Sequence, residues 1–160
     1  MFRAKYLGQP DLKQTSSYRI VFKQLPLSDK KQSTGVKMMF NFATLVFVNP
    51  QGVAEKAQST LNCAQANTAD KQPQSQSQSA ASCQVVITNK GKKVMDLTRF
   101  DYQIELPSGS KTIPWPEFQT VTKGRFIMPE HHVTLDITPL LGGETAKTFT
   151  MVDLFNRDED

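Results

Sequence analysis

The chain lacks long apolar runs, and this absence limits what it can be. No window of the 160 residues reaches the ~18 consecutive apolar positions of a membrane-spanning helix. The N-terminal stretch MFRAKYLGQPDLKQ lacks the apolar region of about 7–15 residues that a signal peptide requires. We therefore expect no membrane insertion, and we find no export signal in the sequence as it stands.

Motifs of catalysis and of nucleic-acid recognition are also missing. There is no glycine-rich phosphate loop and no serine elbow, and no carboxylate is paired with a base or nucleophile. The net charge of +4 comes from scattered lysines without an aromatic-interleaved basic motif. His131 and His132 would point to opposite faces of a strand, which favours a turn over a metal site. We expect no enzyme, catalytic residue, metal, cofactor or nucleic-acid partner.

Cysteine is scarce, with only Cys63 and Cys83, and these two flank a low-complexity segment. That segment, from Gln65 to Ser82, has no large apolar residue to repay the entropy of ordering, so a mobile loop over 65–82 is predicted. Spacing alone does not decide between two reduced thiols and one disulfide. We favour the disulfide in an oxidising compartment, where the chain-entropy account assigns it ~3 kcal/mol.

The apolar residues that are present fall into short β-rich runs. Their share of 38% is below the typical ~45–50%, which predicts long polar connections. No helical period is sustained, and proline and glycine separate the runs, so an all-β sandwich is predicted. The expected strand runs are SSYRIVFKQLP, GVKMMFNFATLVFVNP, STLNCA, CQVVITNKGKK with a turn at Lys90-Gly91, VMDLTRFDYQIEL, GRFIMP, HVTLDITPL and AKTFTMVDLF.

One of these runs, GVKMMFNFATLVFVNP, is unusually apolar for a half-solvated strand. A strand alternates its side chains between two faces, so every second residue shares a face. That alternation puts Val36, Met38, Phe40 and Phe42 together. Taken without context, the stripe is the core face of a central strand; a surface that binds another protein is the alternative.

The motifs YRIVFKQLP, FVNP, ITNKG and GRFIMPEHHVTL follow one another in a recognisable order. This order resembles that of the periplasmic chaperones of the chaperone-usher pathway, which assemble pili on Gram-negative bacteria. The likeness spans Tyr18 to about Leu141. It implies an immunoglobulin-like β-sandwich over residues 51–160, preceded in residues 1–50 by the last two strands of a similar domain.

The resemblance also implies a function, a compartment and partners. Such chaperones lend alternate apolar side chains of one strand to a pilus (fimbrial) subunit whose own sandwich lacks its final strand, and then deliver the subunit to an outer-membrane usher. The implied donor strand is 35–50, with Val36, Met38, Phe40 and Phe42 as donor residues and Lys37 as a candidate carboxylate anchor. The implied compartment is the periplasm.

The sequence departs from this family pattern at several places. Position 130 is Glu where similar chaperones have glycine, and Leu45 stands where they often carry a basic residue or proline. Immunoglobulin-like domains need ~100 residues, so the first domain is expected to be truncated and its signal peptide lost. Without the other strands of the first domain, the donor strand would be exposed, and we expect it to self-associate. The alternatives are a secreted structural β-sandwich subunit and an inactive chaperone fragment.

Overall fold

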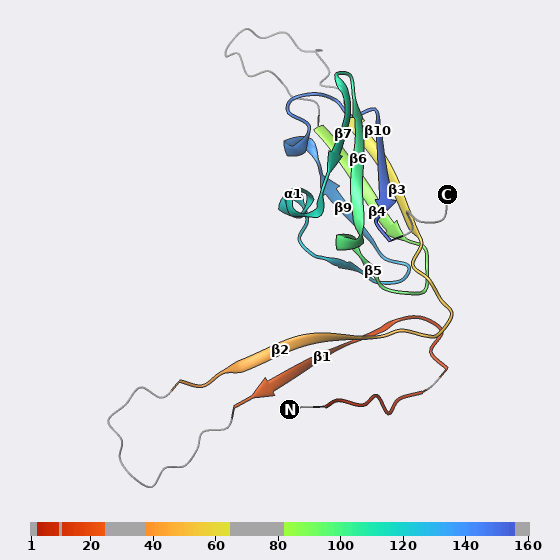
Figure 1. The fold of residues 1–160 in the computed structure, drawn as a ribbon, viewed down its shortest axis with the longest axis vertical. Helices are drawn as coiled ribbons and strands as arrows, with labels where there is room; N and C mark the ends of the chain where they lie inside the picture. Colours follow the sequence, from red (N-terminus) through yellow and green to blue (C-terminus); the bar gives the residue numbers. More distant parts are fainter. Residues whose placement is uncertain (1–2, 10, 25–37, 65–81, 156–160) are drawn as a thin grey trace.

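The structure is a computed structural model of the chain, and it describes residues 3–9, 11–24, 38–64 and 82–155. Within these residues it has ten β-strands, all paired antiparallel, and only short helical turns. The predicted all-β class is therefore confirmed. Figure 1 shows two parts, a long two-stranded hairpin and a more compact unit built from the later strands.

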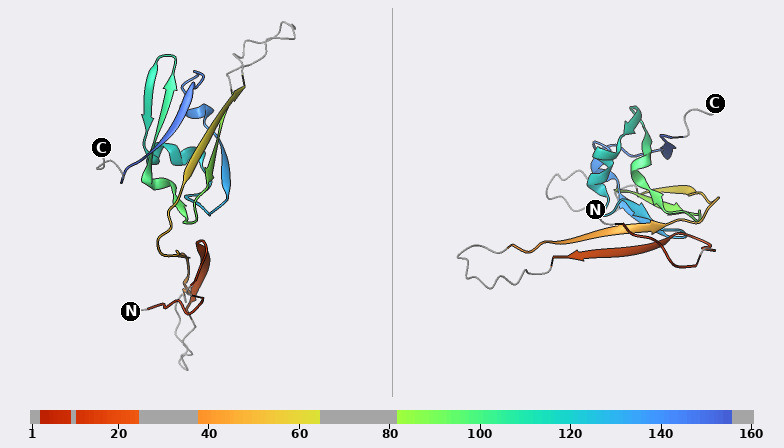
Figure 2. Two further views of the ribbon diagram at one scale, coloured as in Figure 1. Left: turned by 90° about the vertical axis from the view of Figure 1, so that its right-hand side faces the viewer. Right: turned by 60° about the horizontal axis from the view of Figure 1, so that its bottom comes forward.

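The hairpin consists of β1 (Ser16–Lys23) and β2 (Asn41–Val48). Both strands are rich in β-branched and aromatic residues, which favour a pleated, extended backbone. Their register pairs Phe22 with Phe42 and Ser16 with Val48. The strands β1 and β2 both lie within the runs predicted from the sequence, but each is shorter than its predicted run. Figure 2 shows the hairpin extending away from the compact unit, and among the described residues no further strand pairs with it.

The compact unit, which we call the two-sheet unit, comprises β3 to β10. Its two main sheets have three strands each, in the orders β3-β4-β9 and β10-β6-β7, and β5 pairs with β8. The strands are β3 (Ala57–Ala64), β4 (Ser82–Asn89), β5 (Met95–Asp96), β6 (Phe100–Leu106), β7 (Gly109–Ile113), β8 (Phe126–Ile127), β9 (His132–Asp136) and β10 (Thr148–Asp153). The helical turns are η1 (Leu97–Arg99), α1 (Trp115–Phe118), η2 (Gln119–Val121) and η3 (Thr138–Leu140).

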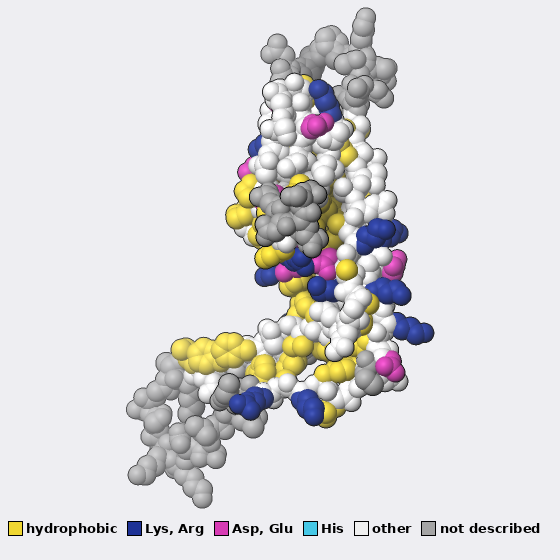
Figure 3. Space-filling view, turned by 45° about the vertical axis from the view of Figure 1, so that its right-hand side comes forward, with side chains coloured by type: hydrophobic (Ala, Val, Ile, Leu, Met, Phe, Trp, Pro, Cys, Tyr) yellow, Lys and Arg dark blue, Asp and Glu magenta, His cyan; other side chains and the backbone are white. Residues whose placement is uncertain are grey.

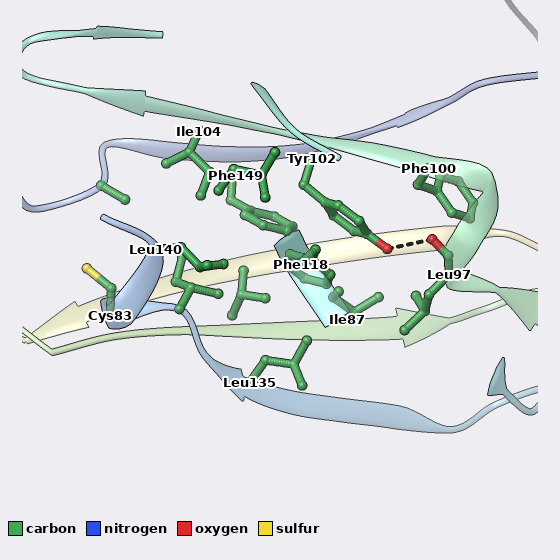
Figure 4. Packing of buried hydrophobic residues seen from close by; sticks show 14 of the residues in the cluster. Cys83, Ile87, Leu97, Phe100, Tyr102, Ile104, Phe118, Leu135, Leu140 and Phe149 are labelled. Carbon is green, nitrogen blue, oxygen red and sulfur yellow. Dashed lines mark hydrogen bonds between the residues drawn. The ribbon is translucent and has the colours of Figure 1, made fainter. Parts of the chain in front are cut away.

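The core of this unit lies between the two main sheets (Figure 4). Every second residue of β4 and β6 is buried, as expected when one face of each sheet is covered. The Tyr102 ring stacks on Phe118 from α1, with ring centroids 3.5 Å apart. Its hydroxyl donates a 2.7 Å hydrogen bond to the Leu97 carbonyl, so the one polar atom of this buried side chain is satisfied. Burial raises the pKa of the Tyr102 hydroxyl.

Several elements of the unit differ from the prediction: η1 and η3 interrupt or end runs predicted as strands, and β7, α1 and η2 were not expected. β7 follows directly on the turn at Ser108, and its sequence GSKTI has too little alternation to be recognised as a strand. α1 is a single turn, too short to show a helical period, with Pro116 near its start. It nevertheless contributes Phe118, which is fully buried in the core.

The segment around the two histidines differs slightly from the prediction. The turn covers positions 129 and 130, while His131 follows it and His132 already begins β9. Glu130 has φ +60°, the left-handed region that glycine adopts most readily. This backbone angle gives a physical reason why a glycine is expected at position 130.

Candidate binding surface on the hairpin

One face of the hairpin carries a set of large, solvent-exposed apolar side chains. Antiparallel partners share a face, so the pairing of Phe22 with Phe42 joins alternate residues of both strands into one surface. We call this surface the hairpin apolar face. Its members are exposed by 45% (Tyr18), 39% (Phe22), 67% (Met38), 51% (Phe40) and 66% (Phe42).

The outer part of this face is ordered by local contacts. The Gln24 amide donates to the Phe40 carbonyl at 3.1 Å, and the Phe40 amide donates to Gln24 Oε1 at 3.2 Å. These bonds continue the strand pairing beyond Asn41. The rings of Phe40 and Phe42 lie 6.2 Å apart and nearly parallel, at 18°. Figure 3 shows hydrophobic side chains gathered in a row on this part of the hairpin.

The structure thus brings together part of the predicted donor set. Phe40 and Phe42 share a face, and Met38 continues the same alternation two residues earlier. Val36 and the candidate anchor Lys37 lie outside the described residues. The interpretation as a buried core face is not what the described residues show, because all three side chains are at least half exposed.

The outer edge of β2 is the second feature of this surface. Among the described residues, β2 pairs only with β1. An edge strand of this kind presents a row of backbone amide and carbonyl groups that a further strand can pair with. From Met38 to Val48 the sequence has no charged residue, proline or glycine to discourage such pairing. Leu45, on the opposite face, is also 55% exposed.

The base of the hairpin is held to the two-sheet unit by a buried threonine that precedes β1. Thr15 is only 3% exposed, and its amide donates a 2.9 Å bond to the Lys92 carbonyl. Its hydroxyl donates to Asn49 Oδ1 at 2.7 Å and accepts from the Val94 amide at 2.8 Å. One side chain therefore links the start of β1, the end of β2 and the segment before β5.

We call this contact region between the base of the hairpin and the two-sheet unit the joint. An aromatic contact also stabilises it. The rings of Phe47 in β2 and Phe126 in β8 lie 4.7 Å apart and are tilted by 59°, a favourable edge-to-face arrangement. The Arg125 guanidinium lies over the Phe126 ring at 5.0 Å. Arg125 also donates two hydrogen bonds to the Asp96 carboxylate, of 2.8 and 2.6 Å. Burial alone would raise the pKa of Asp96, but the bonds from Arg125 and Thr98 outweigh it and hold that pKa below its usual value.

The predicted ITNKG motif lies directly beside this joint. Asn89 is fully buried, and its Nδ2 donates to the carbonyls of Lys93 and Ile127 at 2.8 and 3.0 Å. Its Oδ1 accepts from the amides of Lys56 and Gly91. A Cβ on Gly91 would lie 2.4 Å from the Ala54 carbonyl oxygen, so only glycine fits there. The motif positions the segment that carries Lys92 and Val94.

The two cysteines form the predicted disulfide. Cys63 and Cys83 are directly opposite each other in the β3–β4 pair, with Cα atoms 4.0 Å apart, and the sulfur atoms are bonded. Of the predicted 65–82 loop, Ser82 already belongs to β4, and positions 65–81 lie outside the described residues. The disulfide therefore closes the two strands at the ends that flank this segment.

The part of the chain that the structure describes holds no cluster of three or more His, Cys, Asp or Glu that could bind a metal ion. None of the helices in these residues is long and apolar enough to cross a membrane. The joint around Thr15 had no sequence signal, because single threonine, asparagine and phenylalanine residues carry no motif.

Comparisons with protein-family models, with curated proteins and with solved structures find no match to this chain.

Proposed function

We propose that the chain is a chaperone that binds pilus subunits by donor-strand complementation, with β2 as the donated strand. The observation that carries this proposal is the hairpin apolar face beside an unpaired strand edge. A subunit that lacks one strand of its sandwich needs both: backbone groups to pair with and alternate side chains to fill its groove. Phe42 in β2 and Phe40 just before it lie on one side of the hairpin, and the outer edge of β2 is unpaired among the described residues.

The size of the apolar face is sufficient for such binding. Burial of one large apolar side chain contributes ~1.5–3 kcal/mol. Met38, Phe40 and Phe42 are each at least half exposed, so most of this contribution is still available to a partner. Part of it is offset by ordering of the partner's side chains and loss of its free motion. Lys37, which lies outside the described residues, is proposed as the cation for the carboxylate of the subunit.

We further infer that the two-sheet unit is the immunoglobulin-like C-terminal domain of such a chaperone, and that the hairpin is the end of the preceding domain. Two antiparallel three-stranded sheets around one core support this inference. The Cys63–Cys83 disulfide supports an oxidising compartment such as the periplasm, since disulfides are rare in reducing ones. Delivery of the bound subunit to an outer-membrane usher would follow.

The experiment that tests the proposal uses a panel of pilus subunits from which the N-terminal donor segment has been deleted. Each is refolded with the chain, and the soluble one-to-one complex is measured by size-exclusion chromatography. Phe40→Asp puts a charge into the apolar groove and should abolish the complex without changing the melting temperature of the two-sheet unit.

Met39→Asp is the matched control, because Met39 neighbours Phe40, is 64% exposed and lies on the opposite face of the strand. It should retain the complex. The proposal is wrong if no subunit is kept soluble by the unchanged chain, or if Phe40→Asp and Met39→Asp behave alike.

A further inference from the structure

The hairpin carries two methionines whose surroundings differ from those of the other methionines. Met38 and Met39 are 67% and 64% exposed, whereas Met95 is fully buried. Met128 and Met151 are half-buried. Oxidation of a thioether requires access to its sulfur, so among the methionines that the structure describes an oxidant reaches Met38 and Met39 first.

We propose that Met38 is a site of reversible oxidation, and that this oxidation lowers the affinity of the hairpin apolar face for the bound pilus subunit. This inference rests on the proposed function, because it concerns regulation of the same surface. Met38 precedes β2, and the alternation of an extended backbone puts it on the side that carries the stacked rings of Phe40 and Phe42. Met39 has nearly the same exposure but lies on the other side, so the two differ in position and not in access.

The oxidant is a peroxide, and the reaction is a transfer of one oxygen atom. A lone pair of the Met38 sulfur attacks one oxygen of hydrogen peroxide, and the O–O bond breaks. The leaving hydroxide takes the proton from the oxygen now bound to sulfur and becomes water. The sulfur loses two electrons and the peroxide gains them. The product is methionine sulfoxide, which methionine sulfoxide reductases convert back to the thioether.

The sulfoxide changes the chemistry of the apolar face. A thioether is flexible and apolar and fits irregular hydrophobic grooves. A sulfoxide oxygen is a strong hydrogen-bond acceptor, and moving it from water into an apolar groove without a donor is unfavourable. Oxidised Met38 should therefore weaken binding by roughly 10- to 100-fold. Oxidised Met39 should leave binding nearly unchanged, since it does not enter the groove.

The test uses the full chain and a subunit from the panel that forms the one-to-one complex. The chain is treated with hydrogen peroxide, sulfoxides are located by peptide mass mapping, and the dissociation constant is measured before and after. Met38→Leu and Met39→Leu are matched variants, because leucine keeps a similar volume and does not oxidise. Oxidation should weaken binding in the unchanged chain and in Met39→Leu, but not in Met38→Leu. Treatment with methionine sulfoxide reductase should restore binding.

The rate of methionine oxidation in the complex is an independent measurement. A bound subunit should slow oxidation of Met38 more than that of Met39. The inference is overturned if Met38→Leu loses as much affinity on oxidation as Met39→Leu, or if the unchanged chain loses none. Absence of binding before any oxidation would instead refute the proposed function, so the two failures are distinguishable.

Discussion

At the scale of single residues, position 130 combines a glutamate with a backbone conformation that favours glycine. Glu130 has φ +60°, and its amide donates a 2.9 Å hydrogen bond to the carbonyl of the buried Asn89. The left-handed conformation costs a residue with a side chain ~1–2 kcal/mol, whereas glycine adopts it freely. The conformation persists because the Asn89 bond and the start of β9 hold the turn on both sides.

Replacing Glu130 by glycine should therefore stabilise the chain. The gain is reduced by the greater freedom of glycine in the unfolded chain, so we expect a net increase of roughly 0.5–1 kcal/mol in the free energy of unfolding. Chemical denaturation of the two-sheet unit measures it. Glu130→Ala keeps the Cβ and serves as the control. Equal stability of the glycine and alanine variants would show that the backbone angle is not the cause.

At the scale of elements, the hairpin keeps its place through the joint at its base. Thr15 closes this joint with three hydrogen bonds, and Phe47 packs on Phe126 beside it. The joint matters because an isolated two-stranded hairpin is marginally stable in water. The stability of the proposed binding strand therefore depends on a contact far along the hairpin from Phe40.

Thr15→Val tests this dependence with a side chain of nearly the same shape. Valine removes the hydroxyl and leaves the Val94 amide and Asn49 Oδ1 without this partner, at a cost of about 1–3 kcal/mol. Hydrogen exchange should become faster at Val94 and across β1. Thr15→Ser keeps the hydroxyl and should remain close to the unchanged chain. Exchange rates in Thr15→Val equal to those of Thr15→Ser would contradict the account.

The Asp96–Arg125 pair makes the same region sensitive to acid. The pKa of Asp96 is lower in the folded than in the unfolded chain, so its stabilising effect is complete above its ordinary value of about 3.9. It is lost as the pH falls below that value through the folded pKa. Asp96→Asn should thus be less stable than the unchanged chain at neutral pH, and the difference should shrink below about pH 4. Denaturation at several pH values measures this, and a constant difference down to pH 2 would be evidence against the pair's role.

The strands and helices differ in how well the sequence predicts them. The strands with clear alternation, such as β4 and β6, were predicted because their buried faces leave a period of two. β7 and α1 were missed because each is short and mostly polar or aperiodic. Phe40 and Phe42 were located on one face, but their exposure depends on what lies above that face, and a pattern of residues does not contain that information.

At the scale of the whole molecule, the two parts are stabilised differently. The two-sheet unit buries its apolar residues in its own core. The hairpin exposes the hairpin apolar face and also Val21, Met39 and Leu45 on the other side, and neither of its outer strand edges is paired among the described residues. A surface of that kind favours binding to a partner strand or to a second copy of the chain. The central claim is that a pilus subunit takes this place.

Hydrogen exchange on the complex tests that claim most directly. The chain is bound to a subunit that lacks its donor segment, and amide exchange is compared with that of the free chain. The account predicts slower exchange in residues 38–48, where the outer edge of β2 is unpaired in the free chain, and little change in β4 or β6. Slower exchange confined to the two-sheet unit, with 38–48 unchanged, would contradict it.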